Sequence, residues 1–200
     1  MQYQKDEVRE KILEEALKEL DKSGYEGASI RNIAKNASTS VGNFYKYFKS
    51  KDDMYEKLIG SVYDELVDCL EQFYRVEFND NMENIFCWLM EKLMDIVKNK
   101  SVEFSVLLNK SSGSKYENCK IIFAEYITNT VTKNIKYQLS LNNRRLKENF
   151  IIHVLSWSLI EGISVILKEK KNGMEVKKHI LKLIEILYGD IISKVESENI

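Results

Sequence analysis

The two histidines of the chain, His153 and His179, are the candidates for metal or acid–base chemistry. Helical di-metal enzymes use Glu-x-x-His pairs, and neither histidine has a glutamate three residues before it. Glu175 and His179 stand four residues apart, but a single pair near a helix start is typical of a solvated surface. The sequence also lacks Gly-x-Ser-x-Gly, P-loop and Gly-x-Gly-x-x-Gly motifs. We therefore expect no enzyme activity, no metal site and no cofactor.

A second kind of chemistry, the binding of an anion, is indicated by a short basic segment. Residues 27–51 contain five basic residues and no acidic residue, although the whole chain has a net charge of −1. A solvated basic face is the simplest interpretation of such a segment, and a surface for an anionic partner is the functional one.

The spacing within this segment predicts two short helices joined by a three-residue turn. Ser29 is a good N-cap for a helix through Asn36, and Ser40 is a good N-cap for a helix through Phe48. The second helix should bury the residues at i, i+3, i+4 and i+7, which are Val41, Phe44, Tyr45 and Phe48. Its outward side should carry Ser40, Asn43, Lys46 and Tyr47. Together the helices form a helix-turn-helix, whose second helix fits the major groove of DNA.

The outward side chains have the chemistry that reads a DNA duplex. Asn43 can form two hydrogen bonds with an adenine edge, while Ser40 and Lys46 can reach a phosphate or a guanine. Gly42 costs about 1 kcal/mol relative to alanine inside a helix. We expect it to permit either close approach to a DNA backbone or tight packing on the first helix of the chain.

Three further side chains suit contacts with phosphates. Tyr45 and Tyr47 flank Lys46, and their hydroxyls can donate to phosphates, although core or boundary packing also explains aromatic residues there. Lys51 lies in the first turn of the next helix, where the helix dipole disfavours a cation. A lysine is favourable at that position when a phosphate docks at the helix terminus.

These motifs resemble the DNA-binding domain of the TetR family of bacterial transcriptional regulators. The resemblance covers residues 5–60 and rests on SIRNIA at residues 29–34 and GNFYKYF at residues 42–48, followed by Lys51. It implies a three-helix DNA-binding head and a larger helical body that binds a ligand and dimerises. It places seven side chains at DNA-contacting positions: Ser29, Arg31, Ser40, Asn43, Tyr45, Tyr47 and Lys51. The turn glycine usual in the family is Ser38 here, so we expect local strain or a reshaped turn.

The rest of the chain predicts helices. The sequence contains no proline and shows no sustained alternation of period two, so the predicted fold class is all-α. The expected helices outside the motif span residues 5–22, 51–78, 82–98, 102–110, 116–141, 143–171 and 174–197. We divide the chain into a helix-turn-helix DNA-binding domain, residues 1–51, and a helical effector-binding and dimerisation domain, residues 52–200.

The last two predicted helices are apolar on more than one face. Apolar side chains go nearly all the way round residues 143–171, and residues 174–197 have a broad apolar face. Helices of this kind must be buried on more than one side. A wide core within one chain is one solution, and a homodimer through these two helices is the more economical one. The family resemblance also implies a four-helix dimer interface.

The middle helices are rich in aromatic residues, most of which we expect in a core. If the body binds a small-molecule effector, some of them should line its cavity. Glu103, Glu125 and Glu161 interrupt apolar runs and could face a cationic ligand, although an exposed helix face explains them as well. The candidate effector-binding residues are Trp88, Phe104, Phe123, Tyr126, Trp157 and Glu161. This set favours an apolar or aromatic organic effector, with or without a positive charge.

Three features favour a cytoplasmic protein without a membrane partner. The N-terminal residues contain no apolar stretch typical of a signal peptide. The apolar run from Ile151 to Leu167 carries His153, Glu161 and three serines, so we expect it to be too short and too polar for a membrane span. Three scattered cysteines without a pairing motif are typical of reduced thiols.

These observations predict a ligand-responsive transcriptional regulator. Its favoured form is a homodimeric repressor that a small molecule releases from a palindromic operator by tilting the long helix of residues 51–78. The alternatives are a helical protein–protein adaptor that uses the basic segment and a small helical enzyme. A salt-sensitive shift with duplex DNA would separate the regulator from the adaptor, and the missing ligand motifs argue against the enzyme.

Overall fold

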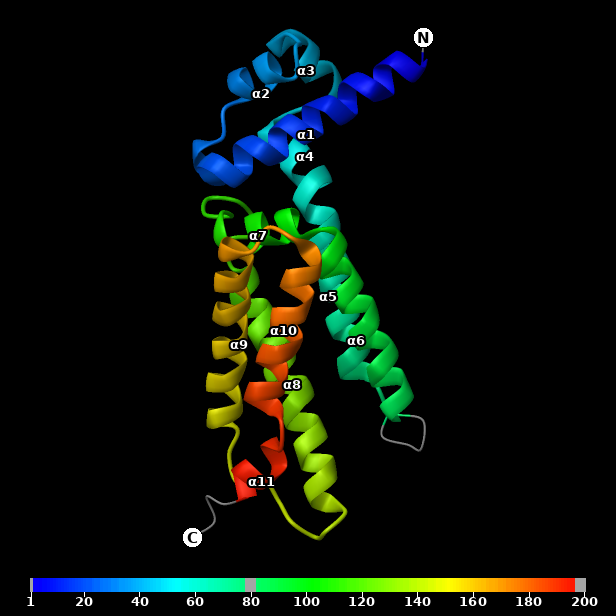
Figure 1. The fold of residues 1–200 in the computed structure, drawn as a ribbon, viewed down its shortest axis with the longest axis vertical. Helices are drawn as coiled ribbons and strands as arrows, with labels where there is room; N and C mark the ends of the chain where they lie inside the picture. The colour runs from blue at the N-terminus through cyan, green and yellow to red at the C-terminus, as the bar shows by residue number, and fades with distance from the viewer. Residues whose placement is uncertain (1, 78–81, 197–200) are drawn as a thin grey trace. The chain divides into compact units, whose positions relative to one another are not determined.

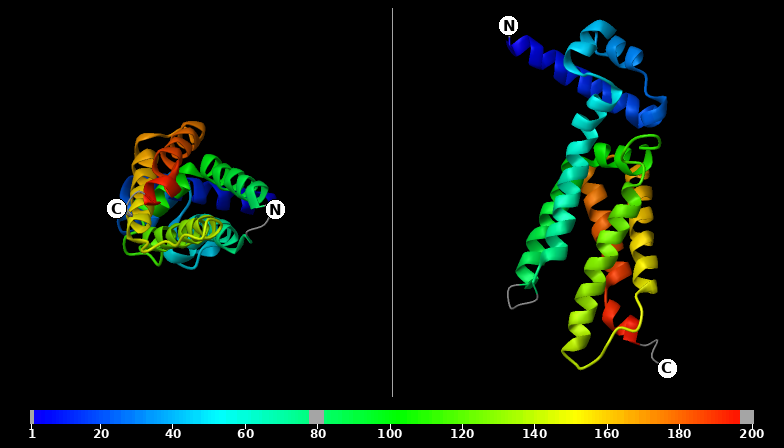
Figure 2. Two further views of the ribbon diagram at one scale, coloured as in Figure 1. Left: turned by 90° about the horizontal axis from the view of Figure 1, so that it is seen from below. Right: turned by 180° about the vertical axis from the view of Figure 1, so that it is seen from behind.

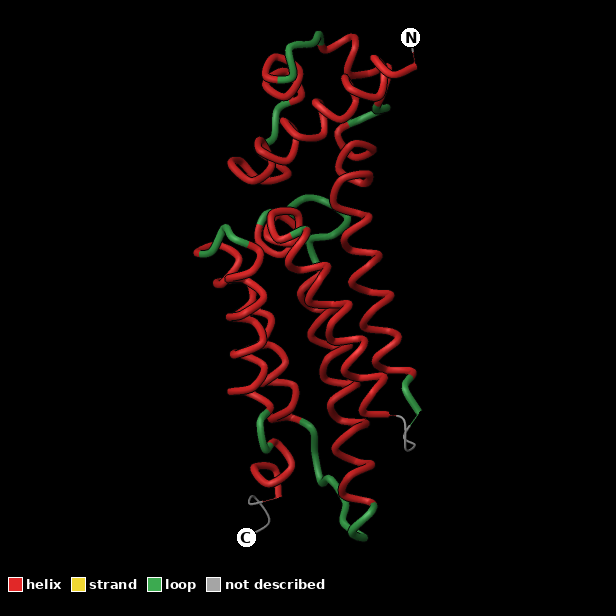
Figure 3. The backbone as a smooth tube through the Cα atoms, turned by 45° about the vertical axis from the view of Figure 1, so that its right-hand side comes forward, coloured by secondary structure: helices red, strands yellow, loops and turns green. Residues whose placement is uncertain are grey.

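The computed structural model describes residues 2–77 and 82–196, and every regular element in these residues is a helix (Figures 1 and 3). The predicted all-α class is therefore confirmed. The helices form two compact units: residues 1–64 with 102–119, and residues 65–101 with 120–200. The predicted boundary after residue 51 divides the chain by function, whereas these units divide it by packing. The functional division stays a prediction.

The first unit contains the helix-turn-helix. The helix predicted for residues 5–22 is longer in the structure: α1 (Gln2–Gly27) continues past a kink at Gly24, which has a φ of 70°. α1 packs against α2 (Ile30–Asn36), and α2 packs against α3 (Val41–Tyr47) (Figure 1). Between α2 and α3, Ser38 has a φ of 54°, so the serine adopts the left-handed conformation that a glycine adopts more easily.

The long helix predicted for residues 51–78 is interrupted in the structure. α4 (Lys51–Tyr55) runs into a π-helical turn, η1 (Glu56–Gly60), and then into α5 (Ser61–Arg75). The buried residues across this turn, Tyr55, Ile59, Val62 and Leu66, keep spacings of three or four residues, so periodicity alone does not reveal the π turn. α5 ends at Arg75, and Phe78, the predicted end, lies outside the described residues.

The first unit also contains α7 (Ser101–Asn109) and the loop that follows it. The Tyr25 backbone N–H donates to the Lys110 carbonyl at 2.9 Å. The Lys110 ammonium donates to the carbonyl of Asp21, and the Ser112 hydroxyl donates to the Glu26 carboxylate at 3.3 Å. The end of α1 is therefore held by a segment that is distant in sequence.

The second unit contains the rest of α5 and five helices: α6 (Met82–Asn99), α8 (Cys119–Ser140), α9 (Phe150–Glu169), α10 (Gly173–Tyr188) and α11 (Ile191–Glu196). α10 packs against both α6 and α9 (Figure 2). One apolar cluster centres on Cys69, Phe73 and Leu89, and another on Ile135, Leu139 and Ile152.

Two predicted helices of this unit are shorter than expected. The helix predicted from residue 143 begins at Phe150, because a turn intervenes in which Asn143 has a φ of 56°. The helix predicted for residues 174–197 breaks after Tyr188, where Asp190 has a φ of 53°, and resumes as α11. Its predicted end at Ser197 lies outside the described residues.

α9 is the one helix in the described part of the chain that is long and apolar enough to cross a membrane by length and composition alone. The expectation that this run is too short and too polar for a membrane span is therefore wrong by length and composition. Part of the helix is core: Ile152, Ser156 and Leu159 are buried in the second unit. The remaining apolar face of α9 is exposed at Phe150, Val154 and Val165.

Candidate nucleic-acid interface

The exposed face of α3 differs from the face that periodicity predicts. Phe44 and Phe48 are fully buried as expected, but Val41 is 37% exposed and Tyr45 is 52% exposed. The prediction that Val41 and Tyr45 face inward is therefore wrong. α3 has only seven residues, and the core covers the side around Phe44 and Phe48 without extending over the first turn. The exposed residues at this end of the motif are Ser40, Val41, Gly42, Tyr45 and Lys46.

Asn43 is hydrogen-bonded within the protein, whereas Gly42 has open space beside it. The Asn43 side-chain amide donates to the Thr39 hydroxyl at 2.8 Å, and its backbone N–H donates to the capping Ser40 hydroxyl at 3.1 Å. Asn43 and Tyr47 are half-buried. A Cβ atom at Gly42 would have the Ser40 hydroxyl as its nearest neighbour, 3.9 Å away. Packing within the protein therefore does not require this glycine, which favours the interpretation of close approach by a partner.

α2 is held to α1 by a buried carboxylate that sequence reasoning missed. Glu19 is only 7% exposed, and its Oε1 accepts from the Ser29 backbone N–H at 3.3 Å and from the Asn32 amide at 3.1 Å. Ser29 caps α2 by accepting from the Asn32 backbone N–H. Arg31 lies on the exposed side of α2. Glu19 looks like any charge of an amphipathic helix in the sequence, so no pattern identifies it.

Lys51 has partners within the protein. Its ammonium donates to the Tyr25 carbonyl at 2.8 Å and to the Glu26 carbonyl at 3.4 Å, and it lies 4.5 Å from the centroid of the Tyr25 ring. These carbonyls at the end of α1 stabilise a cation even though the dipole of α4 disfavours it. The phosphate contact predicted for Lys51 stays a prediction.

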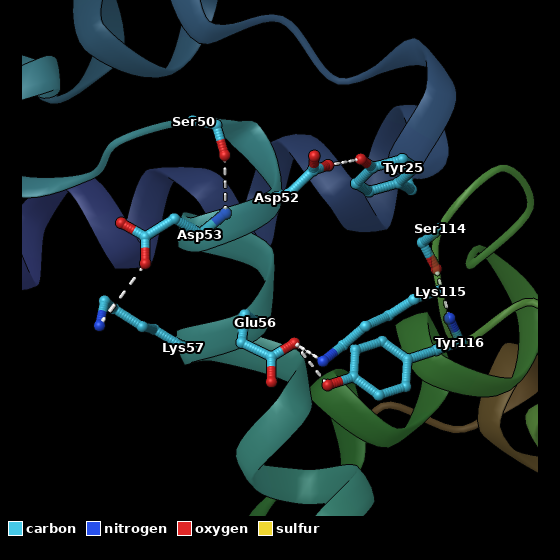
Figure 4. A network of polar contacts seen from close by, with 9 residues as sticks. All are labelled: Tyr25, Ser50, Asp52, Asp53, Glu56, Lys57, Ser114, Lys115 and Tyr116. Carbon is cyan, nitrogen blue, oxygen red and sulfur yellow. Dashed lines mark hydrogen bonds and ion pairs between the residues drawn. The ribbon is translucent and has the colours of Figure 1, made fainter.

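The start of α4 is fixed by its own cap and by the end of α1 (Figure 4). The Ser50 hydroxyl accepts from the Asp53 backbone N–H at 3.0 Å. The Lys49 backbone N–H donates to the Asp53 carboxylate at 2.8 Å and, helped by nearby Lys57, holds the pKa of Asp53 below its ordinary value. Partial burial and the hydrogen bond from Tyr25 to Asp52 raise the pKa of Tyr25 to about 12, so Tyr25 remains a donor at neutral pH.

A third group of polar contacts joins η1 to the loop before α8 (Figure 4). The Glu56 carboxylate accepts from the Tyr116 hydroxyl at 2.6 Å and pairs with the Lys115 ammonium at 2.6 Å. Partial burial opposes ionisation of Glu56, but these two donors outweigh it and hold its pKa below the ordinary value. Burial and the Glu56 carboxylate raise the pKa of Tyr116. These contacts hold η1, which follows the helix-turn-helix and α4, against residues 115 and 116.

The family comparison agrees with this geometry. Residues 12–58 match the model of a family described as "Bacterial regulatory proteins, tetR family", and this range contains α2, α3 and α4. The chain belongs to the TetR family. It is therefore a transcriptional regulator with a helix-turn-helix, and its relatives are regulators rather than enzymes.

Sequence relatives of this TetR-family chain are also regulators. It is 34% identical over 64 residues to "Probable HTH-type transcriptional regulator YttP" of Bacillus subtilis, and this match spans 32% of the chain and 31% of YttP. It is 21% identical over 148 residues to IcaR of Staphylococcus epidermidis, the negative transcriptional regulator of the biofilm operon icaADBC. That match spans 74% of the chain and 78% of IcaR.

Solved structures of TetR-type regulators share the fold. A transcriptional regulator of the TerR/AcrR family from Aquifex aeolicus VF5 superposes with a TM-score of 0.57 at 17% identity, covering 90% of this chain and 99% of that one. NalD, the secondary repressor of the MexAB-OprM multidrug efflux pump in Pseudomonas aeruginosa, gives 0.54 at 16% identity, covering 92% and 96%.

The effector-binding residues predicted for this TetR-family regulator are spread over four helices. Phe104, on α7, belongs to the first unit, whereas the other five belong to the second. Trp88 on α6 is 57% exposed and lines a surface hollow with Glu65, Lys92 and Asp95.

The other members of that set have partners or are buried. Phe123 is 2% exposed, and the Tyr126 hydroxyl donates to Glu71 at 3.0 Å. Glu161 pairs with Lys120 at 3.0 Å, so its charge is balanced within the protein. Trp157 is half-buried. The predicted effector site therefore stays a prediction.

Proposed function

We propose that this regulator is a cytoplasmic, homodimeric repressor that binds a palindromic operator and is released by a small-molecule effector. The observation that carries the DNA-binding part is the exposed face of α3, which lies in an acid-free segment of five basic residues. Such a surface attracts a polyanion, and a short exposed helix after a turn fits a major groove.

The proposed DNA contacts divide into two kinds. Exposed Arg31 and Tyr45 suit contacts to phosphates or base edges, exposed Lys46 suits a phosphate, and Gly42 leaves room for the duplex to approach. The side chains with partners inside the protein, Ser29, Ser40, Asn43 and Lys51, would position the two helices while contacting the backbone. Half-buried Tyr47 completes the proposed set.

The proposed homodimer is supported by apolar side chains that the protomer leaves in water. On α9 and α10 these exposed residues are Phe150, Val154, Val165, Met174, Leu181 and Ile186. Exposed apolar side chains gathered on two helices support an interaction site there. A second copy would cover it by two-fold symmetry and would supply a second α3. The half-sites of the operator should then be centred about 34–36 Å apart, or a multiple of this distance.

Control by an effector is supported by a buried polar group in the second unit. Thr132 on α8 is 7% exposed, and its hydroxyl has no hydrogen-bond partner among the described residues. Buried hydroxyls are nearly always paired, which supports a ligand or a water as the partner of Thr132. An effector that binds the DNA-incompatible state more tightly would weaken operator binding. DNA would weaken effector binding by the same factor, which is typically about 5–150-fold. Repression, rather than activation, is favoured because IcaR is a negative regulator and NalD is a repressor.

Selection of bound duplexes from a random DNA pool tests the proposal. The enriched sequence should be a palindrome, and Lys46→Ala should weaken binding to all duplexes alike and lower the slope of affinity against salt by about one. Lys147→Ala, at an exposed lysine in the loop before α9, is the matched control and should leave binding unchanged. A protein that enriches no duplex at low salt would contradict the proposal and favour the adaptor.

A further inference from the structure

We propose that Val41 is a specificity-determining residue that contacts the methyl group of a thymine in the operator. This inference rests on the proposed DNA-binding function and adds the kind of base that the first turn of α3 selects. It follows from an apolar side chain that the sequence pattern assigns to the core but that the structure leaves exposed.

Val41 is the first residue of α3 and is 37% exposed. The four-residue spacing puts Tyr45, which is 52% exposed, on the same side of the helix. Its ring packs edge-on against buried Phe44, with ring centroids 5.5 Å apart. Gly42 adds no side chain beside them, and the space where its Cβ would lie is open to 3.9 Å. Val41 and Tyr45 thus form an apolar edge to which a partner has access.

The charge of the residues around Val41 and Tyr45 indicates which kind of partner binds there. An isolated apolar edge suits many surfaces, but this one lies in residues 27–51, which carry five basic residues and no acid. A DNA duplex supplies the complementary charge. In its major groove, thymine is the base that presents a methyl group, whereas the other edges present hydrogen-bond donors and acceptors that an isopropyl group cannot satisfy. The base that fits Val41 is therefore thymine.

Asn43, the residue first predicted to read a base, is less free to do so. Its amide donates to the Thr39 hydroxyl in the turn before α3. The contact leaves one N–H and the carbonyl oxygen of the amide available, but it fixes the amide, which is half-buried, in an orientation set by the turn. We therefore assign Asn43 to positioning the turn and Val41 to base selection.

The experiment replaces each thymine of the selected operator, one at a time, by deoxyuridine, which lacks only the methyl group. For the wild-type protein, one thymine in each half-site should be sensitive, and its replacement should weaken binding about fourfold per half-site, the factor expected for burying one methyl-sized group. In Val41→Ser this sensitivity should disappear at that thymine. Val41→Ile, which keeps an apolar side chain, should retain it.

Two controls separate the roles of neighbouring residues. Lys46→Ala should weaken every duplex alike and keep the sensitivity to deoxyuridine. Val41→Ala serves as a second apolar truncation, and circular dichroism spectra that match the wild type verify that these surface variants are folded.

Distinct results would overturn the inference and the proposed function. If the wild type selects an operator but tolerates deoxyuridine at every thymine, Val41 does not read a methyl group. If Val41→Ser keeps the full sensitivity, another residue such as Tyr45 makes the contact, and the inference is wrong. If the wild type selects no sequence, the proposed function itself fails and the inference fails with it.

Discussion

At the scale of single residues, Thr132 supplies a test of whether the second unit is prepared for a ligand. Its buried hydroxyl lacks a partner among the described residues, and an unsatisfied group of this kind costs about 1–3 kcal/mol. Thr132→Val, which removes the hydroxyl and keeps the shape, should raise the free energy of unfolding by about 1 kcal/mol without effector. Urea denaturation measures this change, with Thr132→Ser as the control that keeps the hydroxyl. A loss of stability in Thr132→Val would show that the hydroxyl is already satisfied, for instance by an ordered water.

Residue types predict local capping better than they predict long-range contacts. Ser29, Ser40 and the positive φ at Ser38 were predictable because caps and turns depend on a few neighbouring residues. The carboxylate of Glu19 was not, because its partners lie across a helix–helix contact. Val41 was assigned to the wrong side because helical spacing gives the angle of a side chain but not the extent of the core that covers it.

At the scale of elements, the π turn η1 depends on a glycine next to a tyrosine. A Cβ atom at Gly60 would lie 2.6 Å from the Tyr116 hydroxyl and 3.0 Å from the Glu56 carboxyl carbon. Gly60→Ala should therefore lower the free energy of unfolding by about 1–3 kcal/mol through overpacking. Removing the obstructing hydroxyl in Gly60→Ala/Tyr116→Phe should cost less than the sum of the two single changes. Strictly additive losses in urea denaturation would contradict this account of η1.

The contacts of η1 also predict a pH dependence. The pKa of Glu56 is lower in the folded protein than its ordinary value of 4.5, so its contribution to stability is present above that value. The contribution is lost as the pH falls through the folded pKa. Thermal denaturation should therefore show wild type more stable than Glu56→Gln at pH 6, with a difference that shrinks below about pH 4.5. Melting curves that stay the same distance apart from pH 7 to pH 3 would contradict the assignment.

Most helices were predictable as elements, whereas their interruptions were not. α6, α7 and α8 agree with the predicted ranges to within three residues, because long apolar periodicity defines them. The break at Gly189 and Asp190 and the late start of α9 occur where the local sequence still permits a helix. Tertiary packing decides between these conformations, and a single sequence does not contain it.

At the scale of the whole molecule, the packing units combine segments that the sequence separates. Residues 102–119 belong with the helix-turn-helix because Lys110 accepts from the Tyr25 backbone N–H and Glu56 pairs with Lys115. A boundary drawn at residue 51 from charge and motif cannot anticipate such contacts. The all-α class and the family were nonetheless predictable, because they depend on composition and on one motif of fixed spacing.

Assembly gives the next prediction at this scale. Val165 is 56% exposed and Ile186 is 60% exposed in the protomer, so Val165→Asp and Ile186→Asp should fold normally and fail to dimerise. A carboxylate buried without a partner at the proposed interface would cost several kcal/mol. Sedimentation should give the wild type about twice the mass of one 23.4 kDa chain and each variant the mass of one chain. The exposed loop variant Lys147→Glu is the control, and a monomeric wild type at micromolar concentration would contradict the dimer.

The measurement that tests the central claim most directly is the ratio of affinities for the selected operator and a scrambled duplex of the same length and composition. Fluorescence anisotropy at physiological salt measures both affinities on the same protein. A regulator that reads sequence through α3 should bind the operator at least about 10³-fold more tightly than the scrambled duplex. Equal affinities for the two duplexes would contradict sequence-specific recognition and leave the basic segment as a non-specific surface.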